Sequence, residues 1–360
     1  MNRQLSTLWL ALFSLAIIVP ASNTEEPQRP RRVSTSTGIY DVSSPDDIHR
    51  FSAGEIRRLI QMEGGRRHGA GTVPHPVLVY CFEERTFRYT GGKYQNVEIR
   101  YRIHTPRTIR PGRRYPLIVH LHGVGEAGSD NTSSLVHLHE ALPVMIGPER
   151  EDFFLLVTQC PQDDPFWSFR PTQDGTLDVL KAVMNQVIAE NPIDRSRITV
   201  TGISSGGWGA WELLLRHPDM FAGAAPIASG APTQLQRLAT LRRTPIWAFM
   251  SRGEYQGHSE SNHAAIRAIN NSGGSMAIAV GHTGRRHSLE NAFRWMLAQK
   301  QGSWFSPPPG VVVRNTTHSS ILVPFMYIIP FAIIVFLLWG RICEQVASIY
   351  QSARAWGSRF

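Results

Sequence analysis

The stretch Gly202-Ile-Ser-Ser-Gly206 constrains the fold of this chain more than any other part of the sequence. Strand-forming residues, Ile198 to Thr201, precede it, and apolar residues at helical spacing follow it. Glycines two positions before and after Ser204 let strand and helix backbones approach closely, and the serine takes a strained conformation that exposes its hydroxyl. The pattern predicts a nucleophile elbow with Ser204 as the nucleophile, and a plain glycine turn is the alternative.

Short apolar segments alternate with helical ones through the middle of the chain. Strands are predicted at 117–121, 153–157, 198–201, 222–227, 246–250 and 276–280, and helices at 177–189, 209–216, 262–270 and 289–299. Continuous apolar strands separated by helices are typical of a mostly parallel sheet with helices on both faces. The segments 77–82, 87–90 and 97–103 come earlier and predict antiparallel strands at the sheet edge, with a turn at Gly91-Gly92.

The predicted α/β catalytic domain covers residues 76–302. Residues 23–75 are rich in Pro, Ser, Arg and Gly, and we interpret them as a linker or loosely packed arm with one short helix at 46–62. Residues 303–320 contain the run Ser306-Pro-Pro-Pro-Gly310 and are predicted to be a stalk.

Both ends of the chain carry membrane signals. Residues 1–22 combine Arg3, an apolar run and small residues near Ala21, as in a secretory signal peptide. Residues 321–340 are uncharged and long enough for a transmembrane helix. The tail, 341–360, is net basic and is therefore expected in the cytoplasm, with the catalytic domain outside it, in the periplasm or extracellular space.

The charge and the cysteines narrow the possible partners. The formal net charge of +9 comes from scattered arginine pairs, and no nucleic-acid reader motif accompanies them, so we expect surface charge with some attraction to anionic lipid and no nucleic-acid partner. Cys343 lies at the predicted cytoplasmic boundary. Cys81 and Cys160 would share the oxidising side, and the sequence leaves open whether they form a disulfide.

The loops at the carboxyl ends of the strands supply the candidate site. After the strand 117–121, a glycine-rich loop leaves the backbone N–H of Val124 available, and with the N–H of Ser205 it forms the candidate oxyanion hole. A plain glycine turn is the alternative here too. The pairs His120 and His122, and His137 and His139, lack the companions of a zinc site, so no metal or cofactor is predicted.

A serine nucleophile needs a histidine base and an orienting carboxylate. Glu254 is the only acid in the loop that follows the strand 246–250. His282 and His287 both lie in the loop after the last strand. Either histidine alone would more often be a surface residue, but this position favours one of them as the base.

The chain resembles the α/β-hydrolase enzymes grouped with bacterial esterases and peptidase-like proteins, relatives of polyhydroxybutyrate depolymerases and feruloyl esterases. The resemblance covers residues 76–301 and rests on the stretch Tyr115-Pro-Leu-Ile-Val-His-Leu-His-Gly123, on Gln159-Cys-Pro161, on Ile198 to Gly207 and on His217-Pro-Asp-Met-Phe221. It implies an α/β-hydrolase fold and a serine-hydrolase mechanism, and it leaves the substrate open.

Two departures from the family pattern bear on the triad. The family usually has His-Gly-x-x-Asp after the seventh strand, whereas this chain has Met250-Ser-Arg-Gly-Glu254, so Glu254 would replace the aspartate. The family's usual loop length, counted from Gly273-Gly274, ends beside His287, while His282 comes about five residues early. We therefore favour His287 as the base, with His282 as the alternative.

The sequence thus predicts a membrane-anchored extracytoplasmic serine hydrolase, a carboxylesterase rather than a peptidase, with a Ser-His-Glu triad and an acyl-enzyme intermediate. Its expected partners are a small ester or short peptide and the lipid bilayer. The alternatives are a serine peptidase acting on short peptides and a non-catalytic binding or scaffold protein that retains the fold.

Overall fold

The computed structural model describes residues 33–35, 38–40, 47–64, 74, 76–164, 167, 175–250, 256–274, 277–281 and 289–302. The chain divides into two compact units, residues 1–43 and residues 44–360. In the first unit, β1 (Val33–Thr35) pairs antiparallel with β2 (Gly38–Tyr40). The sequence analysis predicted no strand in this region, because strands of three residues are too short to show alternation.

An eight-stranded sheet forms the centre of the second unit, in the order β10-β9-β8-β7-β5-β6-β4-β3. Its strands are β3 (Glu83–Gly91), β4 (Tyr94–His104), β5 (Tyr115–Leu121), β6 (Phe154–Thr158), β7 (Ile193–Ile203), β8 (Gly223–Ile227), β9 (Ile246–Met250) and β10 (Ala277–Gly281). Neighbouring strands pair in parallel across the part β10-β9-β8-β7-β5-β6 of the sheet. The strand β4 pairs antiparallel with both β3 and β6. The predicted parallel sheet with an antiparallel edge hairpin is confirmed.

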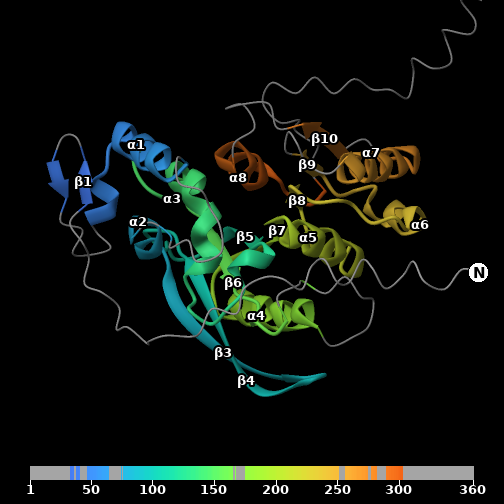
Figure 1. The fold of residues 1–360 in the computed structure, drawn as a ribbon, viewed down its shortest axis with the longest axis horizontal. Coiled ribbons are helices and arrows are strands. Elements are labelled where there is room, and N and C mark those ends of the chain that lie inside the picture. Colours follow the sequence, from blue (N-terminus) through green and yellow to red (C-terminus); the bar gives the residue numbers. More distant parts are fainter. Residues whose placement is uncertain are drawn as a thin grey trace, which may run out of the picture. The chain divides into compact units, whose positions relative to one another are not determined.

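Helices cover both faces of this sheet (Figure 1). α5 (Ser205–Arg216) packs on β5, β7 and β8 from one side, and α8 (Leu289–Ala298) packs on the same strands from the other. The remaining helices are η1 (Asp47–Arg50), α1 (Ala53–Gly64), α2 (Pro76–Tyr80), η2 (Val124–Glu126), η3 (Ser133–Ala141), α3 (Leu142–Met145), α4 (Thr176–Glu190), α6 (Leu235–Leu238), η4 (Ala239–Leu241) and α7 (Gln256–Asn271).

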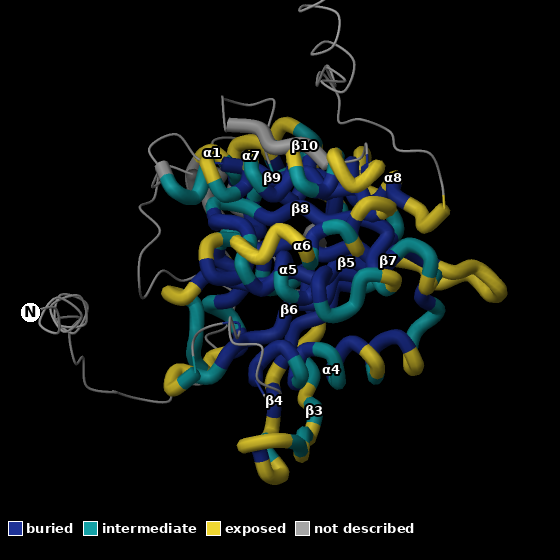
Figure 2. The backbone as a smooth tube through the Cα atoms, turned by 90° about the vertical axis from the view of Figure 1, so that its right-hand side faces the viewer, coloured by how far each residue is buried: buried dark blue, intermediate teal, exposed yellow. Residues whose placement is uncertain are grey.

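The core lies along the central strands, which Figure 2 shows as a buried layer. Every residue of β5 and of β6 is buried, in agreement with their continuous apolar sequences. The far end of the β3–β4 hairpin extends beyond this layer and is largely exposed. The sheet therefore gives a rigid base for the loops at its carboxyl edge.

The segment 77–82 was predicted as a strand, and this prediction is wrong. Residues Pro76–Tyr80 form helix α2, whose Val77 and Leu78 are buried. Proline suits the first turn of a helix because its φ is already fixed and its missing N–H is not needed there. β3 starts only at Glu83, opposite Ile103 of β4, and a short apolar run cannot by itself distinguish strand from helix.

The description of residues 23–75 as a loosely packed arm does not hold for residues 51–59. Phe51, Ile56 and Leu59 are buried, and α1 contacts α3 and η3. The start of α1 is capped: Ser52 N–H donates to Glu55 Oε2 at 2.8 Å, and Glu55 N–H donates to Ser52 Oγ at 3.3 Å. This Ser-x-x-Glu capping box is a sequence signal that the analysis missed. The predicted helix at 46–62 corresponds to η1 and α1.

Among the helices of the described residues, none has the length and apolar character needed to cross a bilayer. The predicted signal peptide (1–22), stalk (303–320), transmembrane helix (321–340) and tail (341–360) lie outside the described residues.

His120 in β5 is fully buried, and neither ring nitrogen has a hydrogen-bond partner. Burial lowers its pKa to about 3, and the nearby His137 and His122 add to the shift. The folded protein therefore keeps His120 neutral at pH 5, whereas an unfolded histidine with a pKa of about 6.5 is mostly protonated there. This linkage favours unfolding by about 2 kcal/mol at pH 5 and by almost nothing at pH 8.

We therefore predict that His120→Leu raises the free energy of unfolding more at pH 5 than at pH 8, by about 2 kcal/mol. Urea unfolding of both proteins at the two pH values measures this difference. The exposed His263→Leu is the control, because it changes no buried group. An equal gain for His120→Leu at both pH values would show that folding does not hold His120 neutral.

Candidate active site

Ser204 lies between the end of β7 and the start of α5, as the sequence predicted. Its φ of 53° and ψ of −117° are a conformation that residues with a side chain rarely adopt. The backbone holds it there: Ser204 N–H donates to Ile227 O at 2.9 Å, and the Ser204 carbonyl accepts from Gly207 N–H at 3.0 Å. Strain of this kind, fixed by its surroundings, is typical of functional sites.

The glycines around Ser204 are required by close approach of the backbone. A Cβ on Gly206 would collide with the carbonyl oxygens of Leu121 and His122, and one on Gly202 would collide with the Gly206 carbonyl. The first turn of α5 is thus pressed against the end of β5. This contact brings the elbow and the loop after β5 together.

The two predicted oxyanion donors are each the first residue of a helix, Val124 of η2 and Ser205 of α5. N–H groups in a first helical turn have no partner within the helix, and they favour negative charge. A Cβ placed on Gly123 would lie 3.6 Å from Ser204 Cβ, so the loop that carries Val124 runs beside the serine. The arrangement suits stabilisation of an oxyanion next to Ser204.

His122 holds the backbone of this loop. Its Nε2 accepts the N–H of Cys160 at 2.9 Å, and its Nδ1 lies 2.6 Å from Gly123 O. Because the Cys160 N–H can only donate, the ring is neutral with the proton on Nδ1; burial lowers its pKa in agreement with this state. Trp167 Nε1 donates to His122 O at 2.8 Å, which is a third hydrogen bond that holds the backbone of this loop.

Gln159, just after β6, is a supporting residue that the sequence analysis did not assign. Its Nε2 donates to Glu126 O at 2.9 Å and to Asp130 Oδ1 at 3.0 Å, and its Oε1 accepts Asn131 N–H at 2.7 Å. Asp130 also accepts N–H groups at the start of η3. The available signal was the position of Gln159 directly after a buried strand, at the same sheet edge as the elbow.

Glu126 is a second residue whose position was not predicted. Its Oε1 accepts a hydrogen bond from His137 Nε2 at 3.2 Å, while its Oε2 is buried without a partner. Burial by itself would raise the pKa of Glu126, but the bond and charge of His137 outweigh it and lower the pKa. Oε2 lies 2.7 Å from the point where a Cβ of Gly123 would be, so a side chain at residue 123 would displace the Glu126 carboxylate. A carboxylate therefore lies behind the candidate oxyanion loop.

The residues predicted as acid and base, Glu254, His282 and His287, lie outside the described residues. The strands that precede their loops are described: Gly281 at the end of β10 pairs with Met250 at the end of β9. The two loops thus leave adjacent strands at the edge of the sheet where Ser204 lies. Leu289, where α8 begins, donates its N–H to Glu140 Oε2 of η3 at 2.9 Å. The far end of the histidine loop is therefore tied to the helix that follows the oxyanion loop.

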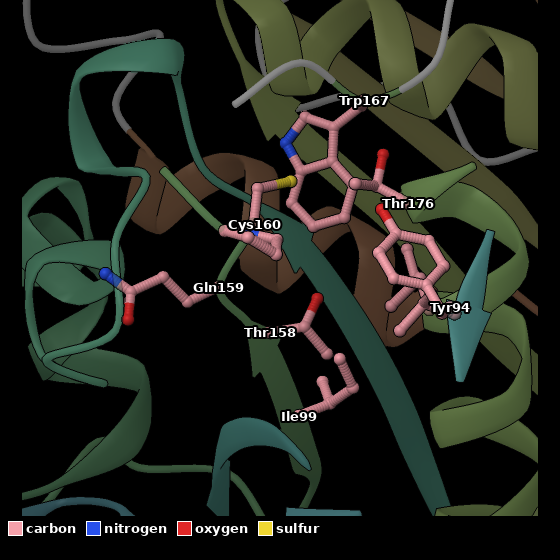
Figure 3. Close-up of a pocket in the computed structure, with 10 residues that line it drawn as sticks. Tyr94, Ile99, Thr158, Gln159, Cys160, Trp167 and Thr176 are labelled. Atoms are coloured by element: carbon pink, nitrogen blue, oxygen red, sulfur yellow. The ribbon is translucent and has the colours of Figure 1, made fainter. Parts of the chain in front are cut away.

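A small, mainly apolar pocket adjoins the back of the oxyanion loop (Figure 3). Cys160, Trp167, Thr176 and Tyr94 are among the residues that line it. Burial raises the pKa of the Cys160 thiol well above its ordinary value, so the thiol stays protonated. Cys81 lies elsewhere, with its thiol 3.2 Å from Val77 O, and both cysteines are free. The disulfide that the sequence left open is not formed.

Comparison with known proteins gives relatives among esterases. Over 89 residues the chain is 35% identical to poly(3-hydroxyalkanoate) depolymerase C from Paucimonas lemoignei, a match that covers 22% of each protein. The crystal structure of a thermostable esterase is similar with a TM-score of 0.54 and 26% identity, over 62% of this chain and 64% of that one. The matches span about a fifth of the depolymerase and less than two thirds of the thermostable esterase.

A family model covers the whole site. Residues 92–305, more than half of the chain, match the Esterase family, described as "Putative esterase". This range contains the elbow, the oxyanion loop and the strands from β5 to β10. The chain therefore belongs to the Esterase family and has an α/β-hydrolase fold.

Proposed function

We propose that this protein is a serine hydrolase that cleaves carboxylic esters through an acyl-enzyme intermediate. The observation that carries the proposal is the strained Ser204, held by backbone bonds between β7 and α5 beside the loop that contains Gly123 and Val124. Holding Ser204 at a φ of 53° and a ψ of −117° costs of order 1–3 kcal/mol, and strain of this kind clusters at functional sites.

The proposed mechanism assigns one role to each residue. Ser204 Oγ attacks the ester carbonyl carbon while His287 takes its proton, and the N–H groups of Val124 and Ser205 stabilise the oxyanion. His287 then gives the proton to the leaving alcohol, and Ser204 remains acylated. Water, deprotonated by His287, then attacks the acyl carbon; the bond to Ser204 Oγ breaks, the acid leaves, and His287 returns the proton to Ser204. Glu254 orients the imidazole and stabilises its charged form; His282 is the alternative base.

We also propose that the enzyme is anchored to a membrane by residues 321–340, with its catalytic domain outside the cytoplasm. The uncharged length of that segment and the apolar run before Ala21 support this location. Short peptides are the alternative substrates, because the same triad cleaves amides and the shape of the pocket decides between them.

Fluorophosphonate labelling of the full chain in detergent tests the proposal, since these probes react with an activated serine. We expect stoichiometric labelling on Ser204, together with faster turnover of p-nitrophenyl esters than of aminoacyl p-nitroanilides. Faster turnover of the anilides would favour a peptidase. A folded protein that takes no label would instead be a binding or scaffold protein that retains the fold.

Glu254→Gln tests the acid. The substitution keeps the shape of the side chain but removes the charge that stabilises the imidazolium, so we predict a loss of about 10²- to 10⁴-fold in kcat. Glu254→Asp should keep measurable activity, because the carboxylate is retained. Steady-state hydrolysis of p-nitrophenyl butyrate measures both. If Glu254→Gln turns over at the wild-type rate, another group orients the histidine.

A further inference from the structure

The amino ends of the parallel strands lie at the edge of the sheet opposite Ser204. Hydrogen bonds join the segments that meet there: Tyr115 N–H to Pro192 O at 2.8 Å, Ala224 N–H to Pro245 O at 2.9 Å and Gln301 N–H to Ser196 O at 2.8 Å. The loops before β5, β7, β8 and β9 and the chain after α8 therefore form one continuous surface.

This surface carries exposed positive charge. We call it the basic face and define it by Arg107, Arg110, Arg195, Arg242, Arg243 and Lys300, all of which are exposed. None of these side chains makes an ion pair within the described residues. The acidic side chains of the same loops are Asp194 and Asp219. With six cations and two acids, the basic face carries a net positive charge.

Neighbouring acids do not cancel this charge, because they have partners of their own. Asp152, before β6, lies 3.3 Å from Arg113. Glu149 and Glu151 lie 3.4 and 3.6 Å from Arg294. Asp194 lies close enough to Lys300 for that charge to help lower its pKa, and the basic face still keeps an excess of positive charge.

One part of the opposite edge is acidic. The oxyanion loop and η3 contain Glu126, Asp130 and Glu140 and no lysine or arginine between residues 122 and 141. The loops after β9 and β10, which leave the same edge, contain Arg252, Arg285 and Arg286, so the orientation of the domain on a charged surface depends on the basic face itself.

An exposed apolar residue accompanies the cations. Ile109, between Arg107 and Arg110, is 49% exposed. The other large apolar side chains that are exposed in the described residues are Val124, the first residue of η2, and Leu235, the first residue of α6. An apolar side chain flanked by arginines suits the headgroup region of a bilayer, where apolar burial adds to attraction by anionic lipid.

The described chain also leaves the domain at this surface. Gln301 is bonded to Ser196 beside Arg195 and Arg197, and the described residues end at Gly302. Residues 303–320 then precede the uncharged stretch 321–340. If this stretch enters a bilayer, the basic face is the part of the domain nearest to it along the chain.

We propose that the basic face binds the anionic headgroups of a membrane surface and holds the domain with Ser204 turned toward the water. Two features favour lipid over nucleic acid as the partner: the exposed Ile109 and the end of the described chain at this face. Binding of nucleic acid would use the cations but neither of these features. The inference does not depend on the triad, but it restricts the proposed function. A site at the far end of the strands receives its ester from solution, not from the bilayer beneath the basic face.

The test measures which end of the domain lies near lipid. Two versions of the full chain carry Cys343→Ser and one new cysteine each: Thr108→Cys on the basic face or Thr233→Cys at the site edge. Both threonines are exposed. Each version is labelled with a dye at its new cysteine and reconstituted in vesicles. Energy transfer to an acceptor lipid is compared in phosphatidylcholine vesicles with and without phosphatidylglycerol. We expect more transfer from position 108 than from 233, and a rise at 108 with phosphatidylglycerol that is lost in high salt.

Two variants with equal change of net charge complete the test. Replacing Arg107, Arg110, Arg242 and Arg243 by Gln should reduce the phosphatidylglycerol-dependent rise at least about twofold. Replacing the exposed Arg57, Arg58, Arg88 and Arg100 by Gln should leave it unchanged. Equal loss in both variants, no rise, or more transfer from 233 would overturn the proposal. The proposal would also be overturned if the protein bound duplex DNA, if only the first variant lost this binding, and if neither variant changed the energy transfer in vesicles.

Hydrolysis of a soluble ester by the same vesicles separates this proposal from the proposed function. We expect both charge variants to hydrolyse p-nitrophenyl butyrate at the wild-type rate, because no arginine of either set belongs to the proposed triad or oxyanion hole; Arg100 alone touches the neighbouring segment, at Ser129 O. Correct orientation with no hydrolysis would leave the basic face intact as a lipid-binding surface and reject only the enzyme.

Discussion

Ser204→Ala is expected to lower ester hydrolysis by about 10³- to 10⁶-fold and to abolish fluorophosphonate labelling. The loss is this large because the acyl-enzyme cannot form without the serine oxygen, and only binding and the oxyanion donors remain to assist a direct attack by water. The protein should stay folded, since the backbone bonds to Ile227 and Gly207 do not use the hydroxyl. Initial rates with p-nitrophenyl butyrate and circular dichroism measure the two effects.

The neighbouring Ser205 gives a matched control. Its hydroxyl oxygen is buried without a partner, and its proposed role uses only the backbone N–H. Ser205→Ala should therefore keep hydrolysis within about tenfold of wild type. If Ser205→Ala loses as much activity as Ser204→Ala, the serine assignment is wrong or the site tolerates no change at the elbow.

The elbow was the most predictable part of the molecule because all its signals are local. The strand, the serine and the flanking glycines lie within a few residues of one another, and the structure confirms the turn between β7 and α5. The predicted helix nevertheless began at residue 209, whereas α5 begins at Ser205. Glycines have low helix propensity, so the sequence pattern hides a first turn that packing against Leu121 stabilises.

The errors in the fold arose where tertiary packing decides between local alternatives. The apolar run 77–82 satisfies a strand pattern, but Pro76 suits the first turn of a helix and Val77 and Leu78 are buried in that conformation, as α2. Composition suggested a loose arm before residue 75, yet Phe51, Ile56 and Leu59 suffice to bury α1. A few apolar residues at helical spacing are enough to form one buried helix face, even where the average composition of the segment is polar.

The support of the oxyanion loop could not be read from the sequence, because its contacts join distant segments. Gln159 lies 33 residues from Glu126 and bonds to its carbonyl, and Cys160 bonds to His122 across 38 residues. The sequence showed that both segments follow buried strands, which places them at one edge. It did not show which side chains would donate to which carbonyls.

The second large prediction concerns the base. His287→Ala should lower kcat by about 10³- to 10⁶-fold, because without a base the Ser204 hydroxyl keeps its proton at neutral pH. His282→Ala should keep most of the activity. His287 stays a prediction; the nearest described residue after it, Leu289, donates its N–H to Glu140 of η3, which follows the oxyanion loop. His282 directly follows the end of β10 at Gly281.

The pH profile makes this comparison specific for a base. In wild-type protein and in His282→Ala, kcat/KM should fall as pH drops below the pKa of the free enzyme's histidine, since the protonated ring cannot accept the serine proton. The residual rate of His287→Ala should lose this acid limb and rise with hydroxide. The opposite assignment, with the limb lost in His282→Ala and kept in His287→Ala, would transfer the role of base to His282. If both single variants keep the limb and the rate, the proton of Ser204 goes to neither histidine.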